Sequence, residues 1–127
     1  MVLSDRGPDS MLAYQGGGTG LTEMIEKINA ISPPTMTPDL VIFIDASPEV
    51  CHTRIEARNE TRDEFELRDV GFTKRVYQTF KELCQKDEER VASGEQRYPR
   101  YYVFDGNLNE KQLASAVKLQ LDFILED

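Results

Sequence analysis

Hydrophobic residues along this chain fall into short unbroken runs and longer periodic stretches. Residues 39–45 read Asp-Leu-Val-Ile-Phe-Ile-Asp, bounded by Pro38 and by Ser47-Pro48. A short apolar run between such boundaries predicts a strand that is covered on both faces, as in parallel sheets. The same reasoning predicts a second strand over residues 101–104, and a further one over residues 1–4 at the start of the chain.

Between these runs, apolar residues recur every three or four positions, which is the period of an amphipathic helix. Ser47 and Pro48 suit the cap and first turn of a helix with an apolar stripe at Val50, Cys51 and Ile55. A second signal, the N-x-x-E spacing from Asn107 to Glu110, predicts the start of the last helix. The other stripes, which we expect to form the core, are Leu21, Met24, Ile25, Ile28 and Ile31; Phe72, Val76, Tyr77, Phe80, Leu83 and Cys84; and Leu113, Val117, Leu121, Ile124 and Leu125.

Alternating strands and helices predict an α/β fold with a parallel sheet. Each expected strand ends in an aspartate, at Asp5, Asp45 and Asp105. Ligands of open α/β sheets bind beyond the carboxyl ends of the strands, so the three carboxylates are candidates for a functional edge. For Asp45 and Asp105 the alternative, that they only terminate strands and cap the next segment of chain, stays open.

Composition narrows the class of protein. With 127 residues, 39% hydrophobic and 30% charged, the chain is expected to form a single domain over residues 1–127. The net charge of −8 argues against a nucleic-acid partner, although a few arginines in one pocket suffice for a free nucleotide. We predict a cytoplasmic protein without membrane spans or a signal peptide. Cys51 and Cys84 lack a CxxC spacing, so neither a disulfide nor a metal site is expected, and His52 is interpreted as an exposed helix residue.

The first eighteen residues carry a candidate binding site. Asp5-Arg6 sets a carboxylate beside a guanidinium, which could bind a phosphate or could form a surface ion pair. Ser10 and Tyr14 are spaced i and i+4, which places them on one helix face, and Gln15 adds an amide that can read a base or ribose. Gly16-Gly17-Gly18 is interpreted as a helix stop and hinge.

A second candidate is a row of arginines. Arg54, Arg58 and Arg62 recur every four residues and run into an acidic, loop-like stretch over residues 59–66. Arginines on a mobile segment could stabilise the charge of a transferring phosphoryl group. The alternative is a solvated charged face, in which the arginines pair with Glu56, Glu60, Asp63, Glu64 and Glu66.

These motifs together resemble the second half of thymidylate kinase. The resemblance rests on Asp5-Arg6, Ser10, the run Ala13-Tyr14-Gln15-Gly16-Gly17-Gly18, residues 38–45, Pro48-Glu49-Val50, Arg54 and Arg58. It implies a partial P-loop NTPase-type three-layer sandwich with a parallel sheet, in which the N-terminal βα units are missing. The implied reaction transfers the γ-phosphoryl group of ATP to dTMP, giving dTDP and ADP, with Mg²⁺ arriving on the ATP.

The resemblance also implies roles for individual residues. The substrate-binding residues would be Asp5, Arg6, Ser10, Tyr14 and Gln15, with Arg6 on the dTMP phosphate and a dTMP-site helix over about residues 9–16. Arg54 and the loop Asp105-Gly106-Asn107 would contact the adenine of ATP. The lid would span about residues 58–66, with Arg58 or Arg62 as its catalytic arginine. A homodimer is a further possibility.

The sequence also departs from that family. Gly7-Pro8 replaces the aromatic continuation that commonly comes after the Asp-Arg pair, and Met11 stands where some relatives have a polar residue. No GxxxxGK[ST] loop occurs in the 127 residues, so we predict that this chain alone is inactive. The alternatives are a non-catalytic nucleotide-binding or dimerising fragment completed in trans, or a truncated gene product.

Overall fold

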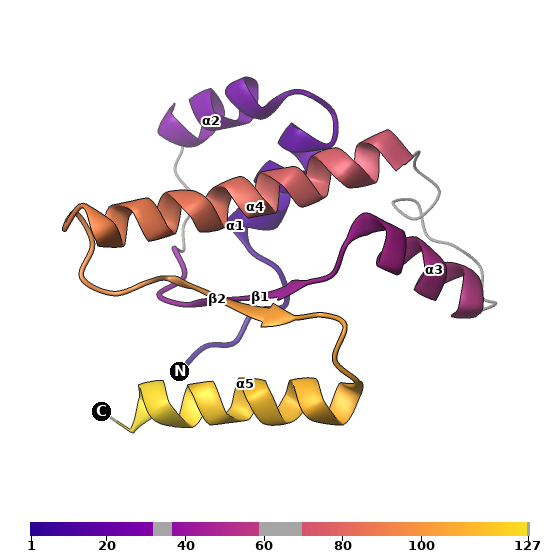
Figure 1. Ribbon diagram of the computed structural model, residues 1–127. Coiled ribbons are helices and arrows are strands. Elements are labelled where there is room, and N and C mark those ends of the chain that lie inside the picture. Colours follow the sequence, from indigo (N-terminus) through magenta and orange to yellow (C-terminus); the bar gives the residue numbers. More distant parts are fainter. Residues whose placement is uncertain (32–36, 59–69, 127) are drawn as a thin grey trace.

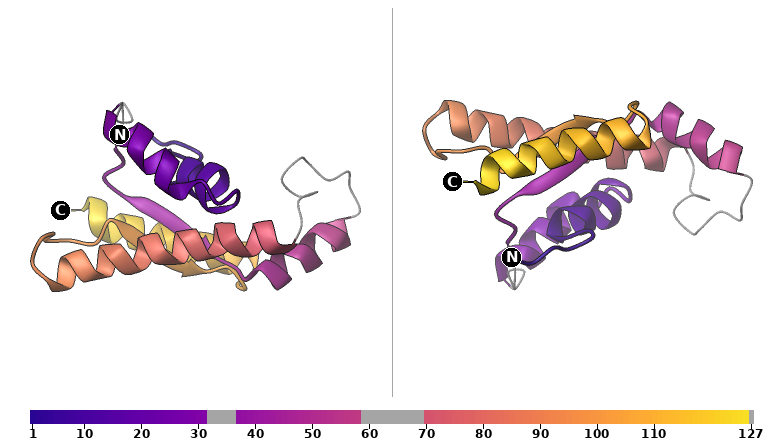
Figure 2. Two further views of the ribbon diagram at one scale, coloured as in Figure 1. Left: turned by 90° about the horizontal axis from the view of Figure 1, so that it is seen from above. Right: turned by 90° about the horizontal axis from the view of Figure 1, so that it is seen from below.

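The computed structural model describes residues 1–31, 37–58 and 70–126. They form three layers, with a sheet between two layers of helix (Figure 1). A parallel sheet lies between the long helix α4 on one face and α5 on the other. The N-terminal helices lie on the β1 side of the sheet (Figure 2), and η1 is the one that packs on α4. In chain order the elements are α1 (Pro8–Met11), the π-helix η1 (Leu12–Gly17), α2 (Thr22–Ile31), β1 (Val41–Asp45), α3 (Pro48–Arg58), α4 (Val70–Ala92), β2 (Tyr101–Asp105) and α5 (Glu110–Leu125).

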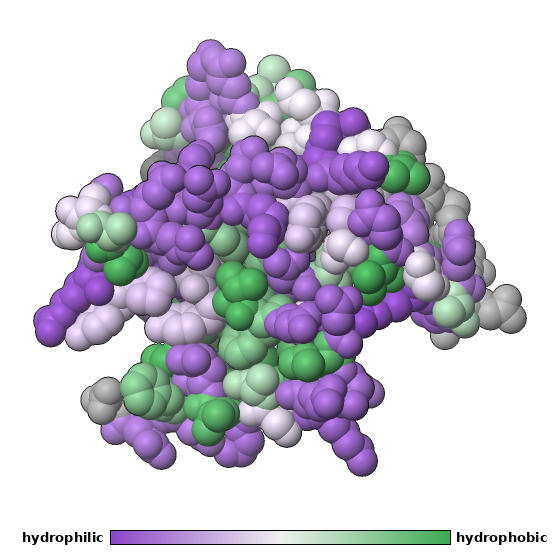
Figure 3. All heavy atoms as spheres, viewed as in Figure 1, coloured by the Kyte–Doolittle hydropathy of each residue, from purple (hydrophilic) through white to green (hydrophobic). Residues whose placement is uncertain are grey.

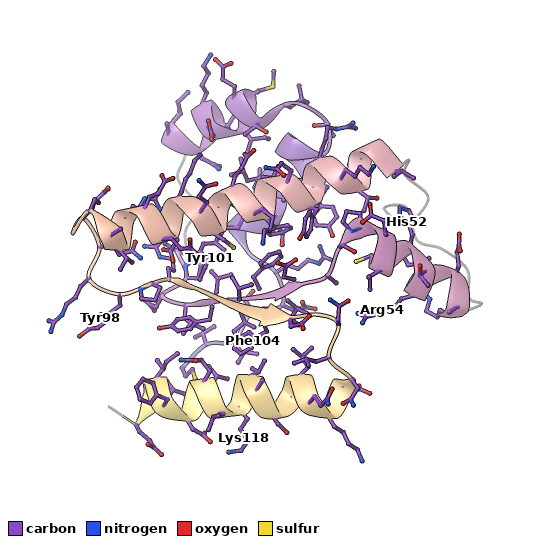
Figure 4. All side chains as sticks on the ribbon, viewed as in Figure 1. His52, Arg54, Tyr98, Tyr101, Phe104 and Lys118 are labelled. Carbon is purple, nitrogen blue, oxygen red and sulfur yellow. The ribbon has the colours of Figure 1, made fainter. Side chains whose placement is uncertain are left out.

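The sheet in the described residues consists of β1 and β2, which pair in parallel from Val41↔Tyr101 to Asp45↔Asp105. Because paired residues of parallel strands share a face, the register determines which side chains point to α4 and which to α5. Phe104 lies on the α5 side of the sheet (Figure 4). Both strands end at the same edge, so the predicted α/β class with a parallel sheet is confirmed.

The core forms where η1 packs on α4. The ring of Phe80 also stacks on Phe43 of β1 with centroids 5.3 Å apart, which joins this core to the sheet. The α4 stripe predicted from periodicity is therefore confirmed as core, with Cys84 buried further along the helix. The core cluster comprises Ala13, Phe72 and Val76, with Tyr14 and Phe80 packed against it.

The strand predicted over residues 1–4 is wrong. Met1, Val2 and Leu3 are 98%, 78% and 84% exposed, and no strand is assigned before β1 in the described residues. A strand needs a neighbour to pair its backbone N–H and C=O groups. Neither described strand pairs with this segment, so local propensity alone does not make it extended structure.

The apolar run of β1 is typical of a strand covered on both faces, but the loss of sheet neighbours that the resemblance implies predicts incomplete cover, and the structure shows incomplete cover. Ile42 and Ile44 remain 36% and 49% exposed, because their face of the sheet is only partly covered. Hydrophobic side chains reach the surface between α4 and α5 in the space-filling view (Figure 3). The stripe of α2 buries Ile25 alone, and α5 contains no fully buried residue. The periodicity of these two helices correctly indicated a helix but overstated its burial.

The sequence predicted the first residues of two helices, α3 and α5, from their capping residues. Ser47 caps α3 as predicted, with its Oγ 3.3 Å from the Val50 amide nitrogen. The predicted start of α5 is wrong by two residues, because Asn109 and Gln112 form the capping box. Asn107 instead donates its amide N–H to Asp105 Oδ1 at 2.9 Å, which keeps it in the preceding turn.

Candidate functional site

The segment predicted to hold a phosphate has an unusual backbone at Arg6. Its φ of 71° is left-handed, which is rare outside glycine and costs about 1–3 kcal/mol. Ser4 Oγ donates a hydrogen bond to the Arg6 carbonyl at 2.7 Å. This turn over residues 4–6, the Arg6 turn, places the guanidinium over the ring of Tyr14, with Arg6 Cζ 4.9 Å from the ring centroid. The structure therefore brings together two residues that the sequence had grouped only by proximity.

The expected helix over residues 9–16 is divided in two. α1 ends at Met11 and is followed by the π-helix η1, whose wider turn changes the i, i+4 relation predicted for Ser10 and Tyr14. Such π-turns often occur at functional sites. Ser10 is half-buried, whereas Gln15 is exposed to solvent.

Tyr14 is held in place by aromatic contacts with α4. Its ring centroid lies 6.3 Å from that of Phe72 and 6.4 Å from that of Phe80, in tilted and edge-on arrangements. Tyr14 thus connects the Arg6 turn to the core, which gives the site a rigid wall.

The helix stops at the glycine triplet as predicted, because η1 ends at Gly17 and Gly18 is its C-cap. Gly16 and Gly17 lie within η1, and Gly16 and Gly18 are buried. A Cβ on Gly17 would collide with the Thr79 side chain, and one on Gly18 with the ring of Phe72. These glycines are required because η1 packs directly on α4. Arg75 Nε reinforces this contact by donating to the Gly18 carbonyl at 2.9 Å.

A second candidate region lies at the carboxyl ends of β1 and β2. A shallow depression of about 390 Å³ opens there, where parallel α/β sheets usually bind ligands. Asp45 and Asp105 both line it, whereas Asp5 is not at a strand end because its strand does not form. The lining consists of Asp45, Ser47, Tyr77, Val103, Phe104, Asp105 and Asn107.

Asp45 is engaged by two α4 residues that the sequence did not single out for this role. Its Oδ1 accepts from the Tyr77 hydroxyl at 2.8 Å and its Oδ2 from Lys81 Nζ at 2.9 Å. Burial would raise the pKa of Asp45, but the hydrogen bonds from Lys81 and Tyr77 outweigh it and lower that pKa. The i, i+4 spacing of Tyr77 and Lys81 was readable from the sequence, but their common partner was not.

The residues expected on the ATP side lie beside this depression. Gly106 is buried, and its amide donates to the Asp45 carbonyl at 2.8 Å. A Cβ at Gly106 would lie 2.8 Å from both Ala46 Cβ and that carbonyl oxygen, which explains the glycine. Arg54 is exposed on α3 and projects to the end of the molecule where the loop after β2 lies (Figure 4).

The remaining predicted residues have different outcomes. Arg58 is the exposed last residue of α3, while Arg62 and the rest of the expected lid lie outside the described residues.

His52 is half-buried and not exposed as predicted, because one side of α3 is covered. Its Nε2 has no hydrogen-bond partner in the described part of the chain. Residues 1–31, 37–58 and 70–126 contain no group of three metal-ligating side chains, and none of their helices is long and apolar enough to cross a membrane.

Comparison with known proteins decides the family. The thymidylate kinase family model matches residues 1–97. The chain belongs to the thymidylate kinase family. Thymidylate kinase of Kosmotoga olearia is 39% identical over 92% of this chain and 51% of the relative. Those of Lactobacillus delbrueckii subsp. bulgaricus and a Synechococcus species are each 38% identical over 72% of this chain, covering 44% and 43% of the relatives.

These matches confirm the resemblance inferred from Asp5-Arg6 and the motifs after it. The observed helix, sheet and helix layers are consistent with part of a P-loop kinase fold. The chain spans about half the length of the curated relatives it matches.

Proposed function

We propose that this chain supplies the thymidylate side of a thymidylate kinase, the enzyme that transfers the γ-phosphoryl group of ATP to dTMP. The observation that carries the proposal is the Arg6 turn, in which a left-handed backbone holds a guanidinium 4.9 Å from the Tyr14 ring. Backbone strain of this kind is typical of ligand sites. The family match over residues 1–97 supports the same assignment.

Arg6 binds the dTMP phosphate in this proposal. A guanidinium offers paired N–H donors that match two phosphate oxygens, and Asp5 beside it orients those donors. The contact with Tyr14 is worth about 0.5–1 kcal/mol at an exposed site, so a phosphate can replace or share it. Ser10, Tyr14 and Gln15 then line the deoxyribose and thymine, with the Tyr14 ring stacking on the base and the Gln15 amide pairing with its edge.

ATP binds beside the carboxyl ends of β1 and β2 in this proposal. Arg54 packs on the adenine, and Asp105, Gly106 and Asn107 form the loop beside it. The depression next to Asp105 and Asn107 supports this placement. Mg²⁺ enters with the ATP and neutralises phosphate charge, while Arg58 and Arg62 stabilise the charge of the transferring group.

A polypeptide of these 127 residues is expected to bind dTMP but not to catalyse phosphoryl transfer. The residues assigned to dTMP are present, whereas the sequence contains no GxxxxGK[ST] loop to hold the β- and γ-phosphates. We therefore propose that this polypeptide binds dTMP without measurable phosphoryl transfer. Turnover that requires a second polypeptide carrying such a loop would favour the alternative, a nucleotide-binding module completed in trans.

Calorimetric titration with dTMP tests the acceptor site. Arg6→Ala should weaken dTMP binding at least tenfold, because it removes charged hydrogen bonds to the phosphate. Arg97→Ala is the matched control, since Arg97 is also an exposed arginine, with Cζ 5.1 Å from the ring of Tyr98. Equal effects of the two substitutions would contradict the assignment. ADP release measured with dTMP and ATP tests the second part, and robust turnover by the 127 residues alone would overturn it.

A further inference from the structure

A hydrogen bond joins α1, which lies between the Arg6 turn and Tyr14, to the sheet. The Tyr101 hydroxyl donates to Asp9 Oδ2, across 92 positions of sequence. Asp9 lies in the first turn of α1, next to Ser10, and Tyr101 is the first residue of β2. Both residues are half-buried, so water competes for this bond less than it would at the surface.

Tyr101 is a fixed donor because its backbone is anchored separately. Its amide nitrogen lies 3.0 Å from Oδ2 of Asp87, a carboxylate that is only 2% exposed. The side chain lies between β2 and α4 (Figure 4). Burial, followed by the hydrogen bond to Asp9, raises the pKa of Tyr101 above that of an ordinary tyrosine, so the phenol stays protonated and able to donate.

The segment that receives this bond has little stability of its own. α1 is four residues long, well below the length at which a helix persists by itself in water. Arg6, three residues before Asp9, holds a left-handed φ that persists only if surrounding contacts determine it. Packing of η1 on α4 holds the segment from its C-terminal side, through Tyr14 and the glycines. The bond to Tyr101 holds it from the N-terminal side of α1.

We propose that Tyr101 is a positioning residue for thymidylate binding, acting through Asp9 to hold α1 and the Arg6 turn in the geometry that accepts the nucleotide. This rests on the proposed function, because Arg6 and Ser10 are the groups positioned. Tyr101 itself touches no part of the nucleotide. Without the bond, the turn samples other conformations, and dTMP must select the competent one at a cost in affinity.

Tyr101→Phe tests the proposal because it removes only the hydroxyl. dTMP binding should weaken about tenfold, equivalent to about 1.4 kcal/mol. Asp9→Ala should have a similar effect, and the double variant should be no weaker than either single one, since both remove the same bond. Asp9→Asn keeps an accepting oxygen and should recover much of the loss. Tyr102→Phe is the matched control, because the strand alternation directs Tyr102 to the face that Phe104 occupies.

Hydrogen–deuterium exchange of the unliganded chain provides a readout independent of dTMP. Tyr101→Phe should speed exchange in peptides covering residues 4–14 and leave α4 and α5 unchanged. Unchanged exchange in residues 4–14, or a uniform increase over the whole chain, would overturn the proposal. If wild type does not bind dTMP, the proposed function fails, whereas faster local exchange would still support the positioning role of Tyr101. Tight wild-type binding that Tyr101→Phe does not weaken would refute the inference and leave the assignment of Arg6 intact.

Discussion

Replacing Asp87 with asparagine should destabilise the fold far more than its conservative chemistry suggests. The Asp87 carboxylate is 2% exposed and accepts from three groups on the segment that leads from α4 into the first residue of β2. Its oxygens lie 2.8 Å from Gln96 Nε2, 2.9 Å from the Arg100 amide nitrogen and 3.0 Å from the Tyr101 amide nitrogen. The carboxylate thus fixes the point at which the chain enters β2.

The magnitude is set by these contacts. A hydrogen bond to a charged group contributes about 1.5–3 kcal/mol, and burying the carboxylate offsets part of the total. Asparagine keeps one accepting oxygen, but its NH₂ group must face N–H donors whichever way the amide is turned. We therefore expect Asp87→Asn to lower the free energy of unfolding by about 2–3 kcal/mol. This is a large part of the total free energy of unfolding of a typical domain, which is about 5–15 kcal/mol.

Urea unfolding followed by far-UV circular dichroism measures this difference. Glu88→Gln is the control, because it makes the same chemical change at an exposed neighbour and should stay within about 0.5 kcal/mol of wild type. A loss below about 0.5 kcal/mol for Asp87→Asn would refute the reasoning that this carboxylate anchors the strand.

The pH dependence gives a second measure of the same interaction. Burial alone would raise the pKa of Asp87, but hydrogen bonds from the Tyr101 amide, Gln96 and the Arg100 amide outweigh it and lower that pKa. Because the pKa is lower in the folded state, the stabilisation is present at neutral pH. It declines below about pH 4, where aspartate in the unfolded chain protonates, and is lost as pH falls through the lowered value. A difference between wild type and Asp87→Asn that stays constant down to acid pH would contradict this account.

Two further predictions concern packing around α4. Gly17→Ala should cost about 1–3 kcal/mol in urea unfolding because its Cβ meets the Thr79 side chain, whereas Gly7→Ala, with open space around its Cβ, should cost little. Equal costs for the two would show that backbone freedom and not close packing selects Gly17. Burial raises the pKa of the Cys84 thiol to about 11, so a thiol reagent at pH 8 should modify the less buried Cys51 first and reach Cys84 only on unfolding. Modification of both thiols at one rate in the native protein would refute this.

Much of the proposed acceptor site was readable from local sequence. Arg6 and Tyr14 were grouped by spacing, and the structure brings them together even though a π-helix changes the register between Ser10 and Tyr14. The lid arginine Arg62 lies outside the described residues, so its role stays a prediction. Tyr101 was identified only as a strand residue, since its link to Asp9 spans 92 positions and no local pattern reveals such a partner.

The sequence by itself determined the types of the elements from α2 onward, the parallel α/β class and the family, because periodicity, caps and short motifs depend on residues that are close along the chain. It also indicated the buried stripe of α4. The tertiary structure decided the features that depend on neighbours distant in sequence: the absence of a first strand in the described residues, the exposed face of Ile42 and Ile44, and the close packing of Gly17 on α4. Strand pairing, burial and carboxylate partners are properties of the assembled fold, since each requires a second segment whose position no local pattern encodes.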